Sequence, residues 1–125
     1  MLKVRDEYTR NQIREYLGGG STVSYLPTID NIVVAACLSK KMNPRAPDEV
    51  LCGRGERMAR DGEQLAGQSG SVPVFLKHGA NRWEYCGSFE VAGSFTSGAQ
   101  FVEAVSASGR GSDVSRVVLL RCVSD

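Results

Sequence analysis

The stretch SVPVFLKHGANRWEYCGSFEV, residues 71–91, decides the fold. Its first arm alternates, with Val72, Val74 and Leu76 on one side, and its second arm alternates as well. The four residues HGAN between the arms are typical of a hairpin turn. The stretch therefore predicts two strands that pair antiparallel across a tight turn.

Two interruptions are expected within this hairpin. Pro73 indicates a sheet edge or a bulge, because proline donates no hydrogen bond to a neighbouring strand. Gly87 indicates a bulge or a close approach of another backbone. It lies on the apolar side of the second arm, which it shares with Trp83, Tyr85, Phe89 and Val91.

Shorter elements are predicted on both sides of the hairpin. A capping box of Thr9 and Gln12 begins a helix that the three glycines at 18–20 end. A second helix is amphipathic, although Gly62 lowers its helix propensity. A third helix has Phe101, Val102 and Val105 facing inward. The helices cover residues 9–17, 56–68 and 97–108, and the remaining extended segments are 21–27, 31–39 (buried on both faces), 49–53 and 115–123.

The resulting order, α-β-β-β-α-β-β-α-β, predicts an α+β fold. Strands dominate and the helices are short, so we expect a curved mixed β-sheet or small barrel flanked by short helices. The 125 residues fit one domain. We expect the N-terminal helix and its glycine stop over residues 1–20 and the barrel core over residues 21–125.

Composition favours a folded cytoplasmic protein. Hydrophobic residues make up 42% and charged residues 23%, and the formal net charge is +1. No apolar run approaches the roughly 20 residues of a membrane helix, and the N-terminus MLKVRDEYTR carries no signal segment. The four cysteines are far apart in sequence and are interpreted as reduced, buried thiols. With a single histidine and no C-x-x-C pair, no metal and no cofactor are predicted.

The turn Gly53-Arg54-Gly55 lies between a strand and a helix and invites a nucleotide-binding interpretation. It lacks the second glycine, the lysine and the hydroxyl of a Walker loop, and Met58 stands at the third glycine position of the dinucleotide pattern. Anion binding at the start of the helix remains physically sensible. A solvated charged face is the open alternative.

Catalysis is not predicted for this chain alone. His78 is the only imidazole and falls in the expected hairpin turn, and no G-x-S-x-G motif occurs. The acidic residues Asp61 and Glu63 do not converge on one helix as a carboxylate pair would need to.

One long segment has a familiar pattern. Residues 33–56, VVAACLSKKMNPRAPDEVLCGRGE, pass from a buried strand through a polar loop to a short strand and a glycine turn. Residues 61–95 then resemble the pattern D-Q-x-L, P-V-x-V and Y-x-G-x-Y-x-V. The whole, over residues 22–123, resembles the SRA (YDG) domain, the modified-cytosine reader of the PUA-like superfamily. Leu51 and Cys52 stand where that family often has Tyr and Thr.

The resemblance implies a site that takes a base flipped out of the duplex, stacks it and reads its edge. Tyr25, Trp83 and Tyr85 would stack, and Asp30 and Asn43 would read the edge, beside Leu51, Cys52 and Gly53. The backbone phosphates would be held by Lys40, Lys41, Arg45, Arg54, Arg57, Lys77 and Arg82. Two alternatives remain open. The aromatic residues could belong to the core, and Lys40 and Lys41 could lie on a solvated loop.

The function expected from this resemblance is recognition of modified double-stranded DNA by base flipping. Modified cytosine is favoured, and the closest counterparts are readers of McrA-like type IV restriction systems. An HNH-type nuclease, fused or separate, would be the partner, and no membrane is involved. A PUA-like RNA-binding or small-ligand-binding domain and a protein-interaction module in phage defence are the alternatives.

Overall fold

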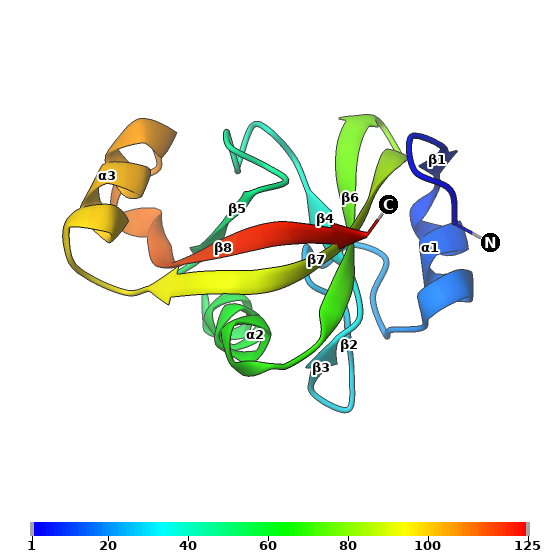
Figure 1. Cartoon of the computed structure of the whole chain (residues 1–125), viewed down its shortest axis with the longest axis horizontal. Coiled ribbons are helices and arrows are strands. Elements are labelled where there is room, and N and C mark those ends of the chain that lie inside the picture. The colour runs from blue at the N-terminus through cyan, green and yellow to red at the C-terminus, as the bar shows by residue number, and fades with distance from the viewer. Residues whose placement is uncertain (1, 125) are drawn as a thin grey trace.

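A computed structural model describes residues 2–124, which form an α+β fold (Figure 1). Its helices are α1 (Arg10–Leu17), α2 (Glu56–Gly67) and α3 (Ala99–Ser108), with a 3-10 turn η1 (Gly111–Asp113). Its strands are β1 (Glu7–Tyr8), β2 (Thr28–Ile29), β3 (Ile32–Val33), β4 (Ala36–Leu38), β5 (Glu49–Gly53), β6 (Ser71–Gly79), β7 (Arg82–Phe95) and β8 (Val114–Ser124).

The main sheet is mixed and curls into a half-barrel with the strand order β4-β6-β7-β8-β5. Strands β4 and β6 run parallel, the other neighbours run antiparallel, and β1 adds to β7 beyond this path. Figure 1 shows α1 and α3 at opposite ends of the sheet and α2 beneath it. The predicted α+β class with a curved mixed sheet and short helices is confirmed.

The hairpin of β6 and β7 is the longest pairing along the sheet, and its predicted bulge is confirmed. Val74 pairs with Gly87 but the next residue, Phe75, pairs with Tyr85, so β7 carries one extra residue there. Gly87 has φ 111°, which favours glycine. The bulge turns the strand over, so Tyr85 packs with Phe75 while Phe89 packs with Val74 in another cluster. The expectation that the aromatic residues of β7 share one side was therefore wrong.

Helix α1 begins at the predicted capping box. The Gln12 amide donates to the Thr9 hydroxyl at 3.1 Å, and the Thr9 amide donates to the Gln12 side chain at 2.9 Å. Ile13 then enters a core cluster with Phe75 and Trp83. Gly18 caps the helix at φ 83°, so the glycine stop is in place.

Helix α2 forms despite Gly62 because that glycine lets it approach β5. A Cβ built on Gly62 would lie 2.6 Å from the Cys52 Sγ. Leu65 from the same face enters the largest core cluster, together with Val50 and Val118. The low helix propensity of Gly62 is thus offset by packing that no larger residue permits.

Residues 21–39 differ from the expectation of two extended segments. Residues 21–27 form bends instead of a strand, and Ser21 Oγ accepts hydrogen bonds from the amides of Val23 and Ser24. The expected strand over 31–39 is divided into β3 and β4. Asp30 and Asn31 both adopt positive φ and close a tight β2–β3 hairpin, a conformation these residue types tolerate well.

Two smaller expectations also need correction. Cys37 and Cys52 are buried free thiols, but Cys86 is half-buried and Cys122 is exposed. On α3 the buried residue is Ala104, with Phe101 and Val105 packed beside it, whereas Val102 is exposed. Within residues 2–124, no helix has the length and apolar character needed to span a membrane.

Candidate functional site

A cavity of about 420 Å³ lies where α1, the bends at 21–25, the β4–β5 loop, α2, β6 and β7 meet. Seven of the predicted site residues line it: Tyr25, Asn43, Leu51, Gly53, Arg57, Lys77 and Trp83. Ten further residues line it: Arg10, Ser21, Val23, Ser24, Cys37, Ser39, Met42, Met58, Asp61 and Arg110. Its volume falls in the range of pockets that hold small molecules.

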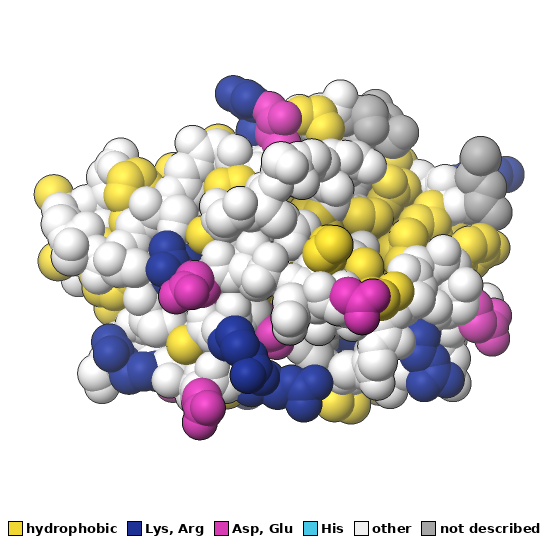
Figure 2. Space-filling view, turned by 90° about the horizontal axis from the view of Figure 1, so that it is seen from below, with side chains coloured by type: hydrophobic (Ala, Val, Ile, Leu, Met, Phe, Trp, Pro, Cys, Tyr) yellow, Lys and Arg dark blue, Asp and Glu magenta, His cyan; other side chains and the backbone are white. Residues whose placement is uncertain are grey.

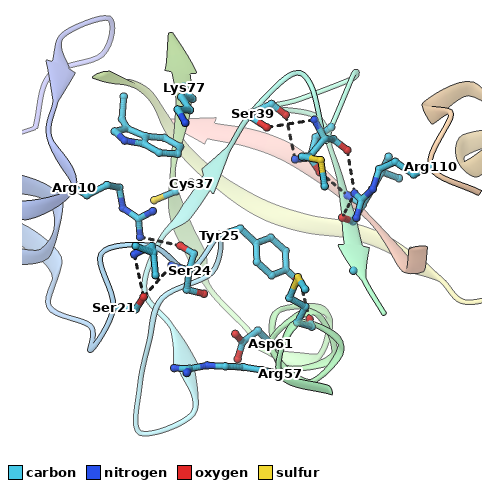
Figure 3. Close-up of a pocket in the computed structure, with 17 residues that line it drawn as sticks. Arg10, Ser21, Ser24, Tyr25, Cys37, Ser39, Arg57, Asp61, Lys77 and Arg110 are labelled. Atoms are coloured by element: carbon cyan, nitrogen blue, oxygen red, sulfur yellow. Dashed lines mark hydrogen bonds between the residues drawn. The ribbon is translucent and has the colours of Figure 1, made fainter. Parts of the chain in front are cut away.

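Tyr25 stands in the middle of this cavity (Figure 3). Its hydroxyl donates a hydrogen bond of 2.6 Å to the Met58 carbonyl on α2, and its own carbonyl accepts from the Cys37 amide at 2.7 Å. Burial raises the pKa of Tyr25 well above its usual range, so the hydroxyl keeps its proton. Tyr25 is therefore held at its hydroxyl and at its backbone, and it lines the cavity in a fixed position.

Among residues 2–124, Asp61 supplies the only carboxylate of the lining. Its side chain projects from α2 and lies below the Tyr25 ring in Figure 3, with the Arg57 side chain beside it. The residue is 8% exposed, and its carboxylate accepts no hydrogen bond from the described part of the chain. Burial raises its pKa, whereas Arg57 and Arg60 act to lower it. This carboxylate is thus an unused acceptor that faces the cavity.

Another part of the lining combines an aromatic ring with two cations. The Arg10 Cζ lies 5.2 Å and the Lys77 Nζ 5.7 Å from the centroid of the Trp83 ring. Figure 3 shows Arg10 and Lys77 to one side of Tyr25 and Asp61 to another. Both distances allow a cation–π interaction.

Asn43 and Arg110 brace the loop between β4 and β5. The Asn43 side chain donates to the Ser39 carbonyl at 3.2 Å and accepts from the Leu51 amide at 2.8 Å. Arg110 Nη1 donates to the carbonyls of Met42 and Leu51 at 3.0 and 2.9 Å. Both ends of the Asn43 amide are therefore engaged in the fold, whereas its predicted role was to read a base edge.

Three predicted base-pocket residues do not line the cavity. Asp30 is exposed in the turn of the β2–β3 hairpin. Cys52 is fully buried between β5 and α2, and burial raises the pKa of its thiol to about 11. Tyr85 is buried against Phe75, with 5.3 Å between the ring centroids. It therefore occupies a core position, which was the alternative interpretation of this residue.

Five of the predicted phosphate-binding cations also lie outside the lining, and three of them are engaged elsewhere. Arg45 forms two hydrogen bonds to Glu103, which lower the pKa of that carboxyl. Arg54 donates to the carbonyls of Ser112 and Val114. Arg82 pairs with Glu7, 3.0 Å from Nε to Oε1. The other two, Lys40 and Lys41, are exposed on the loop after β4.

Sequence reasoning missed the roles of Arg10 and Asp61 in the lining. A signal for Asp61 was present, because Asp61 lies four residues before Leu65, a spacing that places the acid on the same buried face of α2. Arg10 gave no comparable signal. It is the first residue of a short helix, where a charged residue is ordinarily solvent-exposed.

Together these residues offer a flat aromatic face, one buried acceptor and several cations inside one cavity. Such a set suits a planar polar ring that carries an amino group and a nearby negative charge. Among residues 2–124, no three His, Cys, Asp or Glu side chains gather as a metal site. No protein-family model matches the chain, and no curated protein or solved structure matches it either.

Proposed function

We propose that this chain is a non-catalytic module that binds modified double-stranded DNA and holds one extruded base in the cavity. The observation that carries the proposal is the unused Asp61 carboxylate beside the fixed Tyr25 ring. A base would stack on Tyr25 while its exocyclic amino group donates to Asp61, which is how acidic side chains read cytosine. A modified cytosine is the favoured base.

The backbone of the extruded nucleotide would be held by cations around the cavity. Arg57 and Lys77 line it and are exposed, and Lys40 and Lys41 follow Ser39, which also lines it. Phosphate contacts of this kind fix the position of the protein on DNA without reading the sequence. The proposal assigns no chemical step to the chain, and a nuclease, fused or separate, would be the partner that acts on the bound DNA.

Binding to defined duplexes tests this proposal. Fluorescence anisotropy would compare plain DNA with duplexes that carry 5-methylcytosine, 5-hydroxymethylcytosine, glucosylated cytosine, 6-methyladenine or phosphorothioate. We expect tighter binding to one class of modified base. A 2-aminopurine placed opposite or beside the modified base should brighten as its stacking is lost. Equal binding to all duplexes, or to none, would contradict the proposal.

A pair of matched variants locates the reading residue. Asp61→Asn keeps the shape of the side chain but replaces an acceptor oxygen by a donor, so preference for the modified base should fall by roughly ten-fold or more, as expected for one lost base contact. Asp30→Asn makes the same change in the exposed β2–β3 turn and should leave the preference unchanged. The reverse result would move the site to the hairpin.

A PUA-like small-ligand-binding or RNA-binding domain is the second candidate. The observation that favours it is the apolar part of the lining, where Val23, Met42 and Met58 are exposed at the cavity. Such side chains suit a free small molecule as well as a base. Binding of single-stranded RNA or a free nucleoside, without binding of any duplex, would favour this candidate.

A further inference from the structure

Three cavity residues from different elements converge around one indole ring. Arg10 begins α1, Lys77 lies in β6, and Trp83 lies opposite Lys77 in β7. Both cationic groups lie within 6 Å of the Trp83 ring centroid, at 5.2 and 5.7 Å. The pairing of β6 with β7 fixes Lys77 relative to the ring, and the N-terminus of α1 brings Arg10 to the same place.

Arg10 is held rigidly in this position. It is only 7% exposed, its amide donates to the Asn81 side chain at 2.9 Å, and its Nη2 donates to the Ser24 carbonyl at 2.8 Å. Its Nε is buried and finds no acceptor among the described residues. The guanidinium is therefore preorganised, and part of its donor capacity is unused.

The convergence leaves positive charge without a counterion. Arg45, Arg82 and Arg121 each pair with a carboxylate, but neither Arg10 nor Lys77 forms an ion pair within residues 2–124. The Trp83 ring offsets part of this charge through its negative face. Trp83 is itself 9% exposed, and its Nε1 is a further buried donor without an acceptor among these residues. Positive charge is thus in surplus at this end of the cavity, and an anion would offset it.

We propose that Arg10, Lys77 and Trp83 form an oxyanion-binding subsite at this end of the cavity. Guanidinium and ammonium groups donate hydrogen bonds and accept none, so the ligand must bring acceptor oxygens and negative charge. Phosphate and carboxylate both meet this requirement. The identity of the ligand rests on the proposed function. Under that function, the oxyanion is either a phosphate of the extruded nucleotide or an acidic group on the modified base.

The protein carries its own probe for this subsite, because Trp83 is the only tryptophan of the chain. An anion that binds to either cation beside the ring changes the charge near the indole and should shift or quench its fluorescence. The unmodified protein would be titrated with inorganic phosphate, 5-methyldeoxycytidine, its 5′-monophosphate and 5-carboxydeoxycytidine. We expect a response to phosphate, and tighter binding of at least one of the two acidic nucleoside derivatives than of neutral 5-methyldeoxycytidine. Tighter binding of the 5′-monophosphate would show that the subsite holds a backbone phosphate. Tighter binding of 5-carboxydeoxycytidine would show that it holds an acidic group on the base.

Three variants test whether anion binding depends on the residues of this subsite. Lys77→Gln removes one cation at an exposed position and should weaken anion binding roughly ten- to hundred-fold, as expected for a lost hydrogen bond to a charged group. Arg10→Gln should weaken it further, and a melting curve would show whether that variant still folds. Lys3→Gln changes an exposed lysine outside the cavity lining and should have no effect.

The outcomes distinguish this inference from the proposed function. If the neutral nucleoside binds but phosphate and carboxylate add nothing and Lys77→Gln matches the unmodified protein, the oxyanion subsite is wrong and the base pocket survives. If phosphate binds in a Lys77-dependent manner but no modified duplex or nucleoside does, the subsite stands and the proposed function is wrong. A flat fluorescence response to every ligand overturns the subsite, whatever the duplex assays show.

Discussion

Burial raises the pKa of Asp61, although Arg57 and Arg60 on the same helix oppose that rise. The folded protein therefore favours the protonated form of Asp61 more than the unfolded chain does. Its contribution to stability is fully present below the unfolded-state pKa of about 4 and is lost as the pH rises through the higher folded-state pKa. The ionised form of Asp61 is therefore a stability cost to the folded protein.

This pH dependence gives a prediction for Asp61→Asn, because the asparagine side chain is neutral at every pH. We expect the free energy of unfolding of the variant, relative to the unmodified protein, to increase as the pH rises above about 4. Chemical denaturation at several pH values measures it, with Asp30→Asn as the control for the substitution itself. A relative stability that declines toward neutral pH would show that Asp61 is stabilised as the anion. Weaker DNA recognition together with a gain in stability would mark Asp61 as a functional residue.

Single residues also show where sequence reasoning reaches its limit. Tyr25 and Trp83 were predicted at the site from residue type and the resemblance, and both line the cavity. Asn43 lines it too, but a sequence cannot show that both ends of its amide are engaged by Ser39 and Leu51. The importance of Arg10 depends on a ring more than seventy positions away. No local pattern encodes such a contact.

The packing of α2 on β5 depends on a single missing side chain. A Cβ at Gly62 would meet Cys52 at 2.6 Å from Sγ and 2.7 Å from Cβ, so either the helix or the strand must move. Gly62→Ala should therefore lower the free energy of unfolding by about 1–3 kcal/mol, the usual cost of overpacking, despite the better helix propensity of alanine. It should also weaken ligand binding, because α2 carries Asp61 and holds Tyr25.

The same helix provides the matched control. Gly67 is its last residue, is exposed, and has nothing within 4 Å of a built Cβ. Gly67→Ala should be neutral or stabilising by up to about 1 kcal/mol. Urea denaturation of both variants measures the difference. Similar effects of the two substitutions would mean that the contact between Gly62 and Cys52 is not tight.

Elements with strong local signals were predicted well, and elements defined by long-range contacts were not. The capping box fixed the start of α1, and the alternation of residues 71–91 gave the β6–β7 hairpin. The division of residues 31–39 into β3 and β4 was missed, because a continuous apolar run does not show that β3 pairs with β2 while β4 pairs with β6. The bulge at Gly87 was expected, but its effect on which side each aromatic residue faces was not.

At the scale of the whole molecule, the cavity is assembled from segments spread along most of the chain. Arg10 comes from the first helix, Asp61 from the second, and Arg110 from the turn that precedes the last strand. The order of strands β4-β6-β7-β8-β5 and the curl of this sheet bring them together. The class of fold could be predicted from periodicity alone. The composition of the site could not, because it depends on this topology.

The charge of the whole molecule sets how strongly salt should affect DNA binding. The formal net charge is only +1, and Figure 2 shows Lys and Arg side chains along one edge of a face with acidic side chains between them. We therefore expect few phosphate contacts, from the exposed side chains of Lys40, Lys41, Arg57 and Lys77. Two to four contacts predict a slope of log K against log salt concentration of about −2 to −4.

Anisotropy titrations between about 50 and 200 mM salt measure this slope. The double variant Lys40→Gln and Lys41→Gln should make it shallower by about 1–2 and weaken plain and modified duplexes alike, since phosphate contacts carry no sequence information. Arg82→Gln is the control, because Arg82 pairs with Glu7 and lies outside the cavity lining, and it should leave the slope unchanged. If the slope depends on Arg82 and not on the two lysines, the DNA lies across the β1–β7 side of the sheet instead of the loop after β4.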